Sequence, residues 1–291
     1  MVGLGLIGGS LAKALRASGF ATRITAYNRR RASLDYALAA GIIDAVPESL
    51  ETAVAEADLI VVGVPTLAVE HVFETVREHA RPGVVVTDVA SVKGSIVQAA
   101  RRVFGALPPW LVPGHPIAGS EKSGVEAAQA DLFDAHRVIL TPARETDPAA
   151  LELVESMWHL TGATVVRMDV EQHDRVLALT SHLPHLLAFA LVNTLAQHPG
   201  SEDIFRFAAG GFRDFTRIAS SDPVMWRDIS IANSDALLEA LDLFLARMMA
   251  LRESLRDQDA AELEKTFARA RAARETYLQW LEQAPRATRG T

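Results

Sequence analysis

The stretch Met1-Val-Gly-Leu-Gly-Leu-Ile-Gly-Gly-Ser10 opens the chain and precedes a helical pattern that runs from Leu11 to Ser18. Its first three glycines follow the spacing G-x-G-x-x-G, which is typical of a turn that holds a dinucleotide phosphate at the start of a helix. In such a turn Gly3 allows the tight bend, Gly5 lets the backbone approach the pyrophosphate, and Gly8 lets the helix pack closely on its strand. The same spacing also occurs in glycine-rich loops without a ligand, so the prediction depends on the rest of the chain.

A basic cluster follows the expected second strand, which runs from Ile24 to Tyr27. At this place, about 20 residues after the glycines, proteins that bind NAD usually carry an acidic residue for the ribose. Here the chain reads Asn28, Arg29, Arg30 and Arg31. These cations oppose the dipole at the start of the next expected helix, through Leu34 to Ala40, so an external anion would stabilise them. A ribose 2′-phosphate is such an anion. The cluster therefore favours NADP over NAD, with a solvated basic patch as the alternative.

The composition is that of an ordinary globular protein, with 49% hydrophobic and 22% charged residues in a chain of 291. A net charge of −7 argues against general nucleic-acid binding, which needs a basic excess. The absence of cysteine excludes disulfides, thiol catalysis and thiolate metal sites. No signal peptide is visible, and the longest apolar runs, such as Leu59 to Pro65, are too short to span a bilayer. We therefore expect a cytoplasmic protein with no membrane or nucleic-acid partner.

Strand and helix patterns alternate through the first half of the chain. Buried strands are expected over Asp58–Val64 and Val84–Thr87, and further strands over Val138–Thr141 and Thr164–Met168. Helical segments separate them. This alternation predicts an α/β domain over residues 1–169, built on a doubly wound, Rossmann-type parallel sheet.

The pattern changes near Asp169. No convincing strand occurs from Glu171 to Glu282, where apolar residues recur at helical spacing. This predicts an all-helical domain over residues 170–291 that binds substrate and forms a dimer. Long apolar helices in so small a domain often bury surface against a second copy, so we expect a homodimer through this domain. The tail from Ala284 to Thr291 is expected to be disordered.

The start of the chain is unusually short for this fold. A first strand of about five residues is usual, yet only Met1 and Val2 precede Gly3. We expect that part of this strand is missing from the sequence; the alternative is a sheet that tolerates a short strand.

Four further motifs carry the chemistry. They are Thr87-Asp-Val-Ala-Ser91-Val-Lys-Gly94, Gly114-His-Pro-Ile-Ala-Gly119-Ser-Glu-Lys-Ser-Gly124, Ser181-His-Leu-Pro-His185, and Gly210-Gly-Phe-Arg-Asp-Phe-Thr-Arg217 with the residues up to Trp226. In this order the set resembles the prephenate and arogenate dehydrogenases of tyrosine biosynthesis, over nearly the whole chain. The resemblance implies oxidative decarboxylation of prephenate to 4-hydroxyphenylpyruvate, or of arogenate to tyrosine, with hydride transfer from C4 of the substrate to NAD or NADP.

The expected catalytic residues are His115 and Ser91. A base must accept the substrate's hydroxyl proton as the hydride departs, and a neutral imidazole suits this task near neutral pH. His115, in an expected loop between Gly114 and Pro116 at a strand end, resembles the family's catalytic histidine. By the same resemblance Ser91 lies beside the nicotinamide and the substrate hydroxyl, where it relays or orients the proton. The alternative is that Ser91 caps the next helix, and one serine could do both.

The resemblance also implies the substrate contacts. Arg217 holds a substrate carboxylate, which suits the guanidinium fork. His185 contacts the substrate side chain and His182 lines the cleft. Glu121 has a gating or polar-network role, although a solvated loop charge is an equal alternative. Gly210 lets the backbone approach the substrate, or else starts a helix-breaking turn. The two histidines could also bind a metal, but no third ligand stands at a telling spacing, so no metal site is expected.

The cofactor contacts are expected from the glycine turn, the basic cluster and the ends of two strands. They are Gly3, Gly5, Leu6, Ile7, Gly8, Asn28, Arg29, Arg30, Val64, Pro65 and Ser91. Two other functions stay open at this point. One is a different NADP oxidoreductase with a helical domain, many of which use a lysine that has no counterpart between Lys122 and Lys265. The other is a non-catalytic nucleotide-binding sensor. The sequence does not separate prephenate from arogenate.

Overall fold

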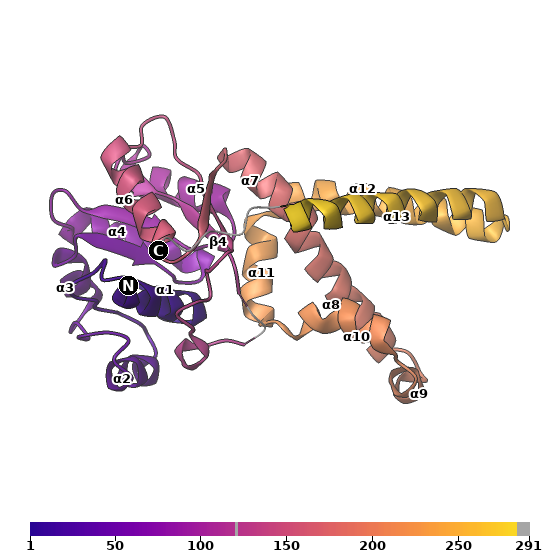
Figure 1. The fold of residues 1–291 in the computed structure, drawn as a ribbon, viewed down its shortest axis with the longest axis horizontal. Helices are drawn as coiled ribbons and strands as arrows, with labels where there is room; N and C mark the ends of the chain where they lie inside the picture. The colour runs from indigo at the N-terminus through magenta and orange to yellow at the C-terminus, as the bar shows by residue number, and fades with distance from the viewer. Residues whose placement is uncertain (120–121, 284–291) are drawn as a thin grey trace.

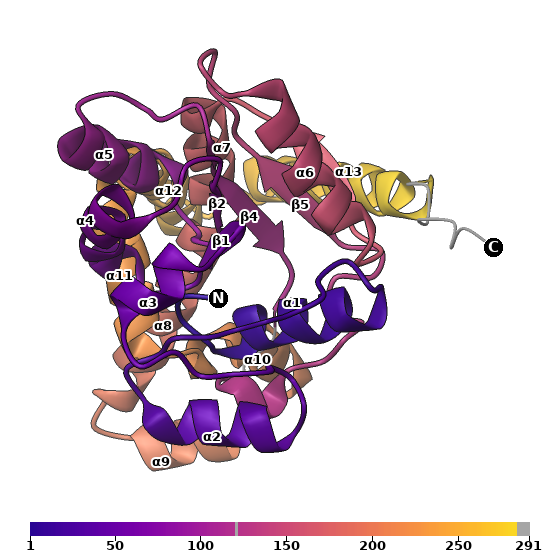
Figure 2. The ribbon, with the colours of Figure 1, turned by 90° about the vertical axis from the view of Figure 1, so that its left-hand side faces the viewer.

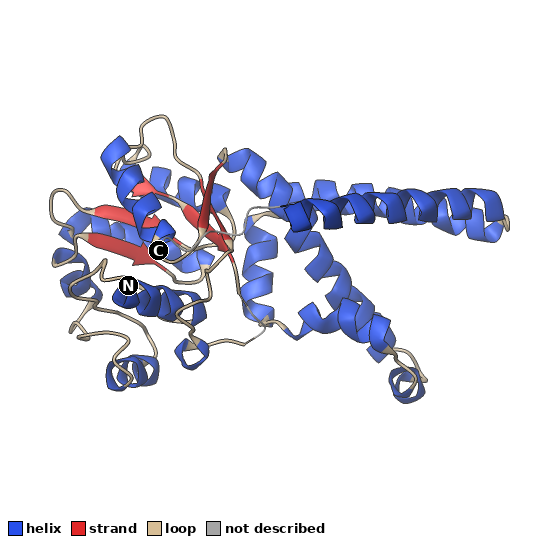
Figure 3. Cartoon of the chain, viewed as in Figure 1, coloured by secondary structure: helices blue, strands red, loops and turns tan. Residues whose placement is uncertain are grey.

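The computed structural model describes residues 1–119 and 122–283. It shows an α/β part that contains every described strand, followed by a part made of helices (Figure 1 and Figure 3). The last strand ends at Arg167 and the first helix of the second part begins at Val170. The domain boundary between residues 169 and 170 stays a prediction, and the segment 284–291 lies outside the described residues.

The first sheet has the strand order of a dinucleotide-binding fold. Its regular strands are β1 (Leu59–Val62), β2 (Val85–Asp88) and β3 (Leu111–Val112), which pair in parallel in that order. Isolated parallel bridges extend the sheet: Val2 lies between Tyr27 and Val62, and Thr25 pairs with Ala45. The direction of winding therefore reverses between Val2 and β1, which is where such folds bind their ligands. The predicted doubly wound parallel sheet is confirmed, with a first strand that consists of Val2 alone, bridged to Tyr27 and to Val62.

Helices cover both faces of this sheet, as Figure 2 shows. They are α1 (Leu6–Ala17), α2 (Arg31–Ala39), α3 (Leu50–Ala55), α4 (Val69–His79), α5 (Lys93–Phe104) and α6 (Pro148–His159). Because side chains alternate along a strand, β1 feeds two cores. Val61 packs in the core with α1 and α6, whereas Ile60 and Val62 pack in the core with α4 and α5. Burial on both faces explains why β1 reads as an uninterrupted apolar run.

A second sheet differs from the expected arrangement. It consists of β4 (Gly114–Ile117), β5 (Arg137–Leu140) and β6 (Thr164–Arg167), and β4 runs antiparallel to β5. The prediction of a loop around His115 is wrong, since this residue pairs with Ile139 within β4. The strand was missed because it contains a glycine and Pro116, which are depleted in strands; proline is tolerated here because β4 pairs on one side only among the described strands.

The helix that follows the glycine turn begins earlier than expected. The predicted helix begins at Leu11, but α1 begins at Leu6, directly after Gly5. Gly8 and Gly9 therefore lie inside the first turns of α1. Glycine is a poor helix former, so local propensity does not predict a helix at these two residues.

The helical part begins with one long helical element. It comprises α7 (Val170–Leu177), a π-helical turn η3 (Ala178–His182) and α8 (Leu183–Ala196). The remaining elements are α9 (Ser201–Arg206), α10 (Gly210–Thr216), η4 (Arg217–Ser220), α11 (Pro223–Ala232), α12 (Ser234–Arg256) and α13 (Ala260–Gln283). In Figure 1, α12 and α13 lie side by side and project away from the sheets as an arm.

The element Val170–Ala196 is long and apolar enough to cross a membrane by length and composition, which the expectation of short apolar runs overlooked. It carries the buried histidines His173 and His182 and packs against α12. Its buried side chains Ala178 and Leu183 form a small core with Leu237 and Ala240 of α12.

Candidate active site

The glycine turn has the geometry of a phosphate cradle. Gly3 has φ +90°, and a Cβ atom there would lie 2.5 Å from the carbonyl carbon and oxygen of Gly63, so the turn needs glycine. A Cβ on Gly8 would lie 2.8 Å from the oxygen of Gly3. At Gly5, by contrast, a Cβ would meet no described atom within 4 Å, which leaves open space at the start of α1. No acidic residue stands in the first turn of α1, so its N–H groups face this space without a competing anion.

The other expected cofactor contacts surround this turn. Val64 and the exposed Pro65 follow the carboxyl end of β1. Asn28 donates from Nδ2 to the carbonyl oxygen of Leu4 at 3.2 Å, which ties the basic cluster to the glycine turn. Arg29 and Arg30 are exposed and form no ion pair with a described residue, whereas Arg31 is paired with Asp35 at 2.8 Å.

A buried ion pair holds the strand that carries His115. Lys93 and Asp88, neither of which has an exposed side chain, are hydrogen bonded to each other. The Lys93 ammonium also donates to the oxygen of Gly114 at 2.6 Å, and the N–H of Gly114 donates to Asp88 at 3.3 Å. Both backbone groups of the residue before His115 are thereby fixed. The pair also ties the end of β2 and the start of α5 to the start of β4.

His115 forms the first link of a line of three side chains. Its Nδ1 lies 2.9 Å from Nε2 of His173. The Nδ1 atom of His173 lies in turn 2.7 Å from Oδ1 of Asp174. His173 is fully buried and His115 is nearly so. Among the described residues, Nε2 of His115 has no hydrogen-bond partner and remains available to a ligand.

Asp174 caps the helix that follows Ser91. Its two carboxylate oxygens accept the N–H groups of Lys93 at 2.9 Å and Gly94 at 2.7 Å, the first residues of α5. The alternative role of Ser91 as the helix cap is therefore wrong: the cap residue is Val92, and the capping carboxylate comes from α7. The Ser91 hydroxyl is partly exposed and makes no hydrogen bond within the described chain.

The second pair of predicted histidines lies on the π-helical turn and the start of α8. Nδ1 of His182 accepts a hydrogen bond from Asn233 Nδ2 at 3.0 Å. The ring of His185 stacks on Trp226 with centroids 3.5 Å apart and planes 18° apart. Its Nδ1 lies 2.9 Å from the carbonyl oxygen of Ser181. The helix widens to a π turn over Ala178–His182, just before Pro184, and Ser181 lies in this turn.

Electrostatics links these residues into one site. The pKa of His115 lies well below its usual 6.5 because of burial and the nearby His173, Lys93 and His182. Burial lowers the pKa of His182 to about 4. The pKa of His185 is lowered by burial and by the charge of Arg217, and η4 with Arg217 packs on α8. The ring nitrogens are therefore neutral at pH 7, and His115 is ready to accept a proton.

The structure brings together most predicted site residues but not all of them. His115 and His182 lie within electrostatic range of each other, as do His185 and Arg217. Glu121 lies outside the described residues. Gly210 starts α10, directly after the break that follows α9, and has open space around its Cβ position. Its contact with substrate stays a prediction.

Reasoning from the sequence missed several residues of the site. They are Asp88, Lys93, His173, Asp174, Trp226 and Asn233. Asp88 and Lys93 belong to the same motif as Ser91, and two opposite charges so close to it in the sequence are a local signal of an ion pair. The contact between His115 and His173 joins residues 58 apart, and no local pattern announces it.

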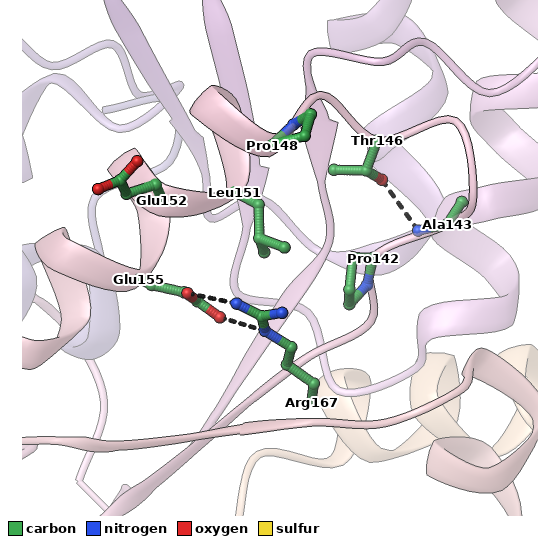
Figure 4. A pocket seen from close by; sticks show the side chains of 8 residues that line it. All are labelled: Pro142, Ala143, Thr146, Pro148, Leu151, Glu152, Glu155 and Arg167. Carbon is green, nitrogen blue, oxygen red and sulfur yellow. Dashed lines mark hydrogen bonds and ion pairs between the residues drawn. The ribbon is translucent and has the colours of Figure 1, made fainter.

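A groove on the α/β part is separate from this site. Figure 4 shows a groove between α6 and β6, lined by Pro142, Thr146, Leu151, Glu155 and Arg167 among others, in which the last two form an ion pair. None of the catalytic candidates lines it.

Over residues 1–119 and 122–283, no group of three or more histidine, aspartate or glutamate side chains is placed to hold a metal.

Comparison with known proteins identifies the family. Residues 11–167 match the prephenate dehydrogenase nucleotide-binding domain, and residues 169–269 match the prephenate dehydrogenase dimerization domain. A cyclohexadienyl dehydrogenase of Zymomonas mobilis is 37% identical over 94% of this chain and 94% of its own. A prephenate dehydrogenase of Bacillus subtilis is 38% identical over 94% of this chain and 74% of its own.

Solved structures agree with this assignment. The prephenate dehydrogenase of Aquifex aeolicus, in complex with hydroxyphenyl propionate and NAD+, has a TM-score of 0.89 and 38% identity over 95% of this chain and 96% of its own. The arogenate dehydrogenase of Synechocystis has a TM-score of 0.79 and 28% identity over 95% of this chain and 98% of its own. This chain therefore belongs to the prephenate dehydrogenase family, and it is a nicotinamide-dependent oxidoreductase of that family.

Proposed function

We propose that the protein oxidatively decarboxylates prephenate, alone or together with arogenate, and that it prefers NADP. The observation that carries this proposal is a neutral, buried His115 whose neighbour Gly114 is bonded to Asp88 at the carboxyl end of β2, within range of the histidines of the helical part. That edge of the sheet is where the glycine turn, Val64 and Ser91 also lie.

His115 is the proposed base. Its free Nε2 accepts the proton of the substrate's C4 hydroxyl as the C4–H bond gives up its hydride, so that a carbonyl forms at C4. The residues of the glycine turn would hold the oxidised nicotinamide cofactor, which would supply the acceptor for this hydride. The bond from the ring to its carboxylate then breaks, carbon dioxide leaves, and the electron pair completes the aromatic ring. The carbonyl oxygen becomes the phenol oxygen and takes up a proton.

Ser91 and Arg217 are proposed to orient the substrate. The Ser91 hydroxyl has no partner within the described chain, so it is free to bond the C4 oxygen. The guanidinium group of Arg217 holds a substrate carboxylate, and His185 contacts the substrate side chain from its stacked position on Trp226. Gly210 and Glu121 keep their predicted roles in this proposal.

The fit of the cofactor rests on the glycine turn. Open space at Gly5, the required glycine at Gly3 and the uncapped N-terminus of α1 together suit a pyrophosphate. The preference for NADP rests on Arg29 and Arg30, which are exposed beside Asn28 and lack an acidic partner among the described residues. A ribose 2′-phosphate would supply the missing negative charge.

A homodimer through the helical part completes the proposal. The arm formed by α12 and α13 exposes large apolar side chains. Among them are Leu255, Phe267 and Trp280, whose exposed fractions are 64%, 60% and 67%. Large apolar side chains that are exposed together on one surface mark an interaction site. The family name for residues 169–269 includes dimerization, which supports a second copy as the partner. The cytoplasmic location and the absence of nucleic-acid and membrane partners stay predictions.

The test is an assay of prephenate and arogenate, each with NAD and with NADP, followed by the absorbance of the reduced nicotinamide. We expect turnover of prephenate, with a higher kcat/KM for NADP than for NAD. Turnover of neither substrate would overturn the proposed reaction, and a higher kcat/KM for NAD would overturn the cofactor preference. Sedimentation of the same sample tests the dimer, which a monomeric mass would contradict.

A further inference from the structure

The line of side chains behind His115 contains two residues that do not take part in the proposed reaction directly. His173 and Asp174 stand at the start of the helical part, whereas His115 belongs to the second sheet. We propose that His173 and Asp174 are positioning residues, which fix the proton of His115 on Nδ1 and so leave Nε2 as the free base. This inference rests on the proposed role of His115.

The argument starts from the carboxylate of Asp174, which can only accept hydrogen bonds when it is ionised. Burial raises its pKa, but hydrogen bonds from His173 and from the N–H groups of Lys93 and Gly94 outweigh burial, and the net pKa is lowered. Asp174 is therefore a carboxylate. Its Oδ1 atom faces Nδ1 of His173 at 2.7 Å, so that nitrogen must carry a proton.

The proton on Nδ1 of His173 then determines the other ring nitrogen. Burial lowers the pKa of His173, and the nearby Lys93 cation lowers it further against the opposing effect of Asp174. The ring is thus neutral and holds a single proton, and its Nε2 is an acceptor. Because Nε2 of His173 lies 2.9 Å from Nδ1 of His115, the latter must donate. The single proton of neutral His115 is therefore on Nδ1.

The opposite arrangement meets an electrostatic conflict. If His115 carried its proton on Nε2, its Nδ1 would be an acceptor and His173 would have to donate from Nε2. A neutral His173 would then turn a lone pair toward Asp174. A doubly protonated His173 would avoid this and would pair with Asp174. Burial and the nearby Lys93 cation nevertheless outweigh that pairing and keep the pKa of His173 below its usual 6.5, so the charged form is disfavoured.

Positioning by such a line of residues has two effects. It aims the free Nε2 of His115 at the ligand side in the form that accepts a proton. It also stabilises the imidazolium that forms in the transition state, because the Nδ1 proton keeps its acceptor. An incorrect tautomer of a catalytic histidine lowers kcat by about 10⁴-fold in the serine-protease case.

The first test reads the tautomer itself. Nitrogen-15 NMR of the protein labelled at histidine separates protonated from unprotonated imidazole nitrogens, and the His115→Asn variant assigns the signals of His115. We expect protonated Nδ1 and unprotonated Nε2 at pH 7. A protonated Nε2 in the wild-type protein would overturn the inference, whatever the activity of the enzyme.

The second test uses a matched pair of variants. In His173→Gln, the amide can place an acceptor where Nε2 of histidine stood, so the contact with His115 survives and the contact with Asp174 is lost. In His173→Asn, the shorter amide reaches Asp174 and leaves His115 without an acceptor. We expect His173→Asn to lower kcat about 100-fold with little change in KM, and His173→Gln to stay within about tenfold of wild type.

Thermal unfolding of both variants separates positioning from folding. A purely structural role for His173 would make activity follow stability, and the variant that keeps Asp174 satisfied would be the more active. That result, with His173→Asn more active than His173→Gln, would contradict the inference. If neither variant folds, the NMR measurement on the wild-type protein still decides. Failure of the proposed function would be distinguishable from failure of this inference, because the wild-type protein would then turn over neither substrate.

Discussion

The Lys93 ammonium donates a hydrogen bond of 2.6 Å to the carbonyl oxygen of Gly114, the residue before His115. This cation has no exposed side-chain surface, and its countercharge Asp88 has none either. Burial lowers the pKa of Lys93 while Asp88 raises it. The position of the proposed base thus depends on a buried ion pair. Removal of either residue would leave the charge of the other buried and unpaired.

Removal of one partner of this pair should destabilise the protein. We expect Lys93→Met to lower the free energy of unfolding by about 3–5 kcal/mol, because Asp88 remains as an uncompensated buried charge. Urea unfolding measures the change. In the control, Asp88→Asn combined with Lys93→Met removes both charges and should recover part of the loss. A midpoint for Lys93→Met equal to that of wild type would contradict the assignment.

The glycine turn offers a pair of substitutions with opposite consequences. In Gly3→Ala the new Cβ meets the carbonyl of Gly63 at φ +90°, so we expect a loss of stability of about 1–3 kcal/mol. In Gly5→Ala the Cβ enters open space, so the apo protein should unfold as wild type does. Its cofactor affinity should nevertheless fall about tenfold, or about 1.4 kcal/mol, because the Cβ occupies the phosphate side. Unchanged affinity in Gly5→Ala would place the pyrophosphate elsewhere.

The basic cluster predicts the cofactor preference residue by residue. We expect Arg29→Ala and Arg30→Ala to raise the KM for NADP about tenfold, the loss of a charge-assisted hydrogen bond, while the KM for NAD changes little. Arg31→Ala is the matched control, because that side chain is already paired with Asp35. Initial rates with both cofactors make the comparison. Equal effects of all three substitutions would indicate a solvated basic patch.

Stability should depend on pH through His182. Its pKa is about 4 in the folded protein, below its ordinary value of 6.5, so the unfolded chain binds the proton more tightly. Stability is therefore full above pH 6.5 and falls as the pH drops from 6.5 to 4, by about 3 kcal/mol from this residue. His115 and His173 add to the fall, since burial lowers their pKa values too. Urea unfolding across this range measures how steeply the free energy of unfolding changes with pH, and this slope should be shallower in His182→Gln. An identical slope in the variant would show that His182 does not contribute to the pH dependence.

The features that the sequence predicts well are those with local signatures. The glycine spacing, the apolar run of β1 and the helical spacing after residue 170 each report on the immediate neighbours of a residue, and the fold class followed from them. The strand β4 escaped because Gly114 and Pro116 disfavour strands by propensity, and only its pairing with β5 makes it one.

The site was predictable only in part for the same reason. His115 and Ser91 stand in motifs, whereas His173 and Asp174 matter because α7 packs on α5 and brings them to His115 and to the first N–H groups of α5. The cap of α5 shows the difference clearly. A serine near a helix start suggests a local cap, but here the cap is a carboxylate from a residue about eighty positions later.

The most direct test of the central claim is the kcat of His115→Asn. Loss of the base should lower kcat by about 10²–10⁴-fold, while cofactor binding and the unfolding midpoint stay as in wild type. The exposed His159→Asn is the control and should keep full activity. A kcat for His115→Asn within tenfold of wild type would show that another group accepts the hydroxyl proton.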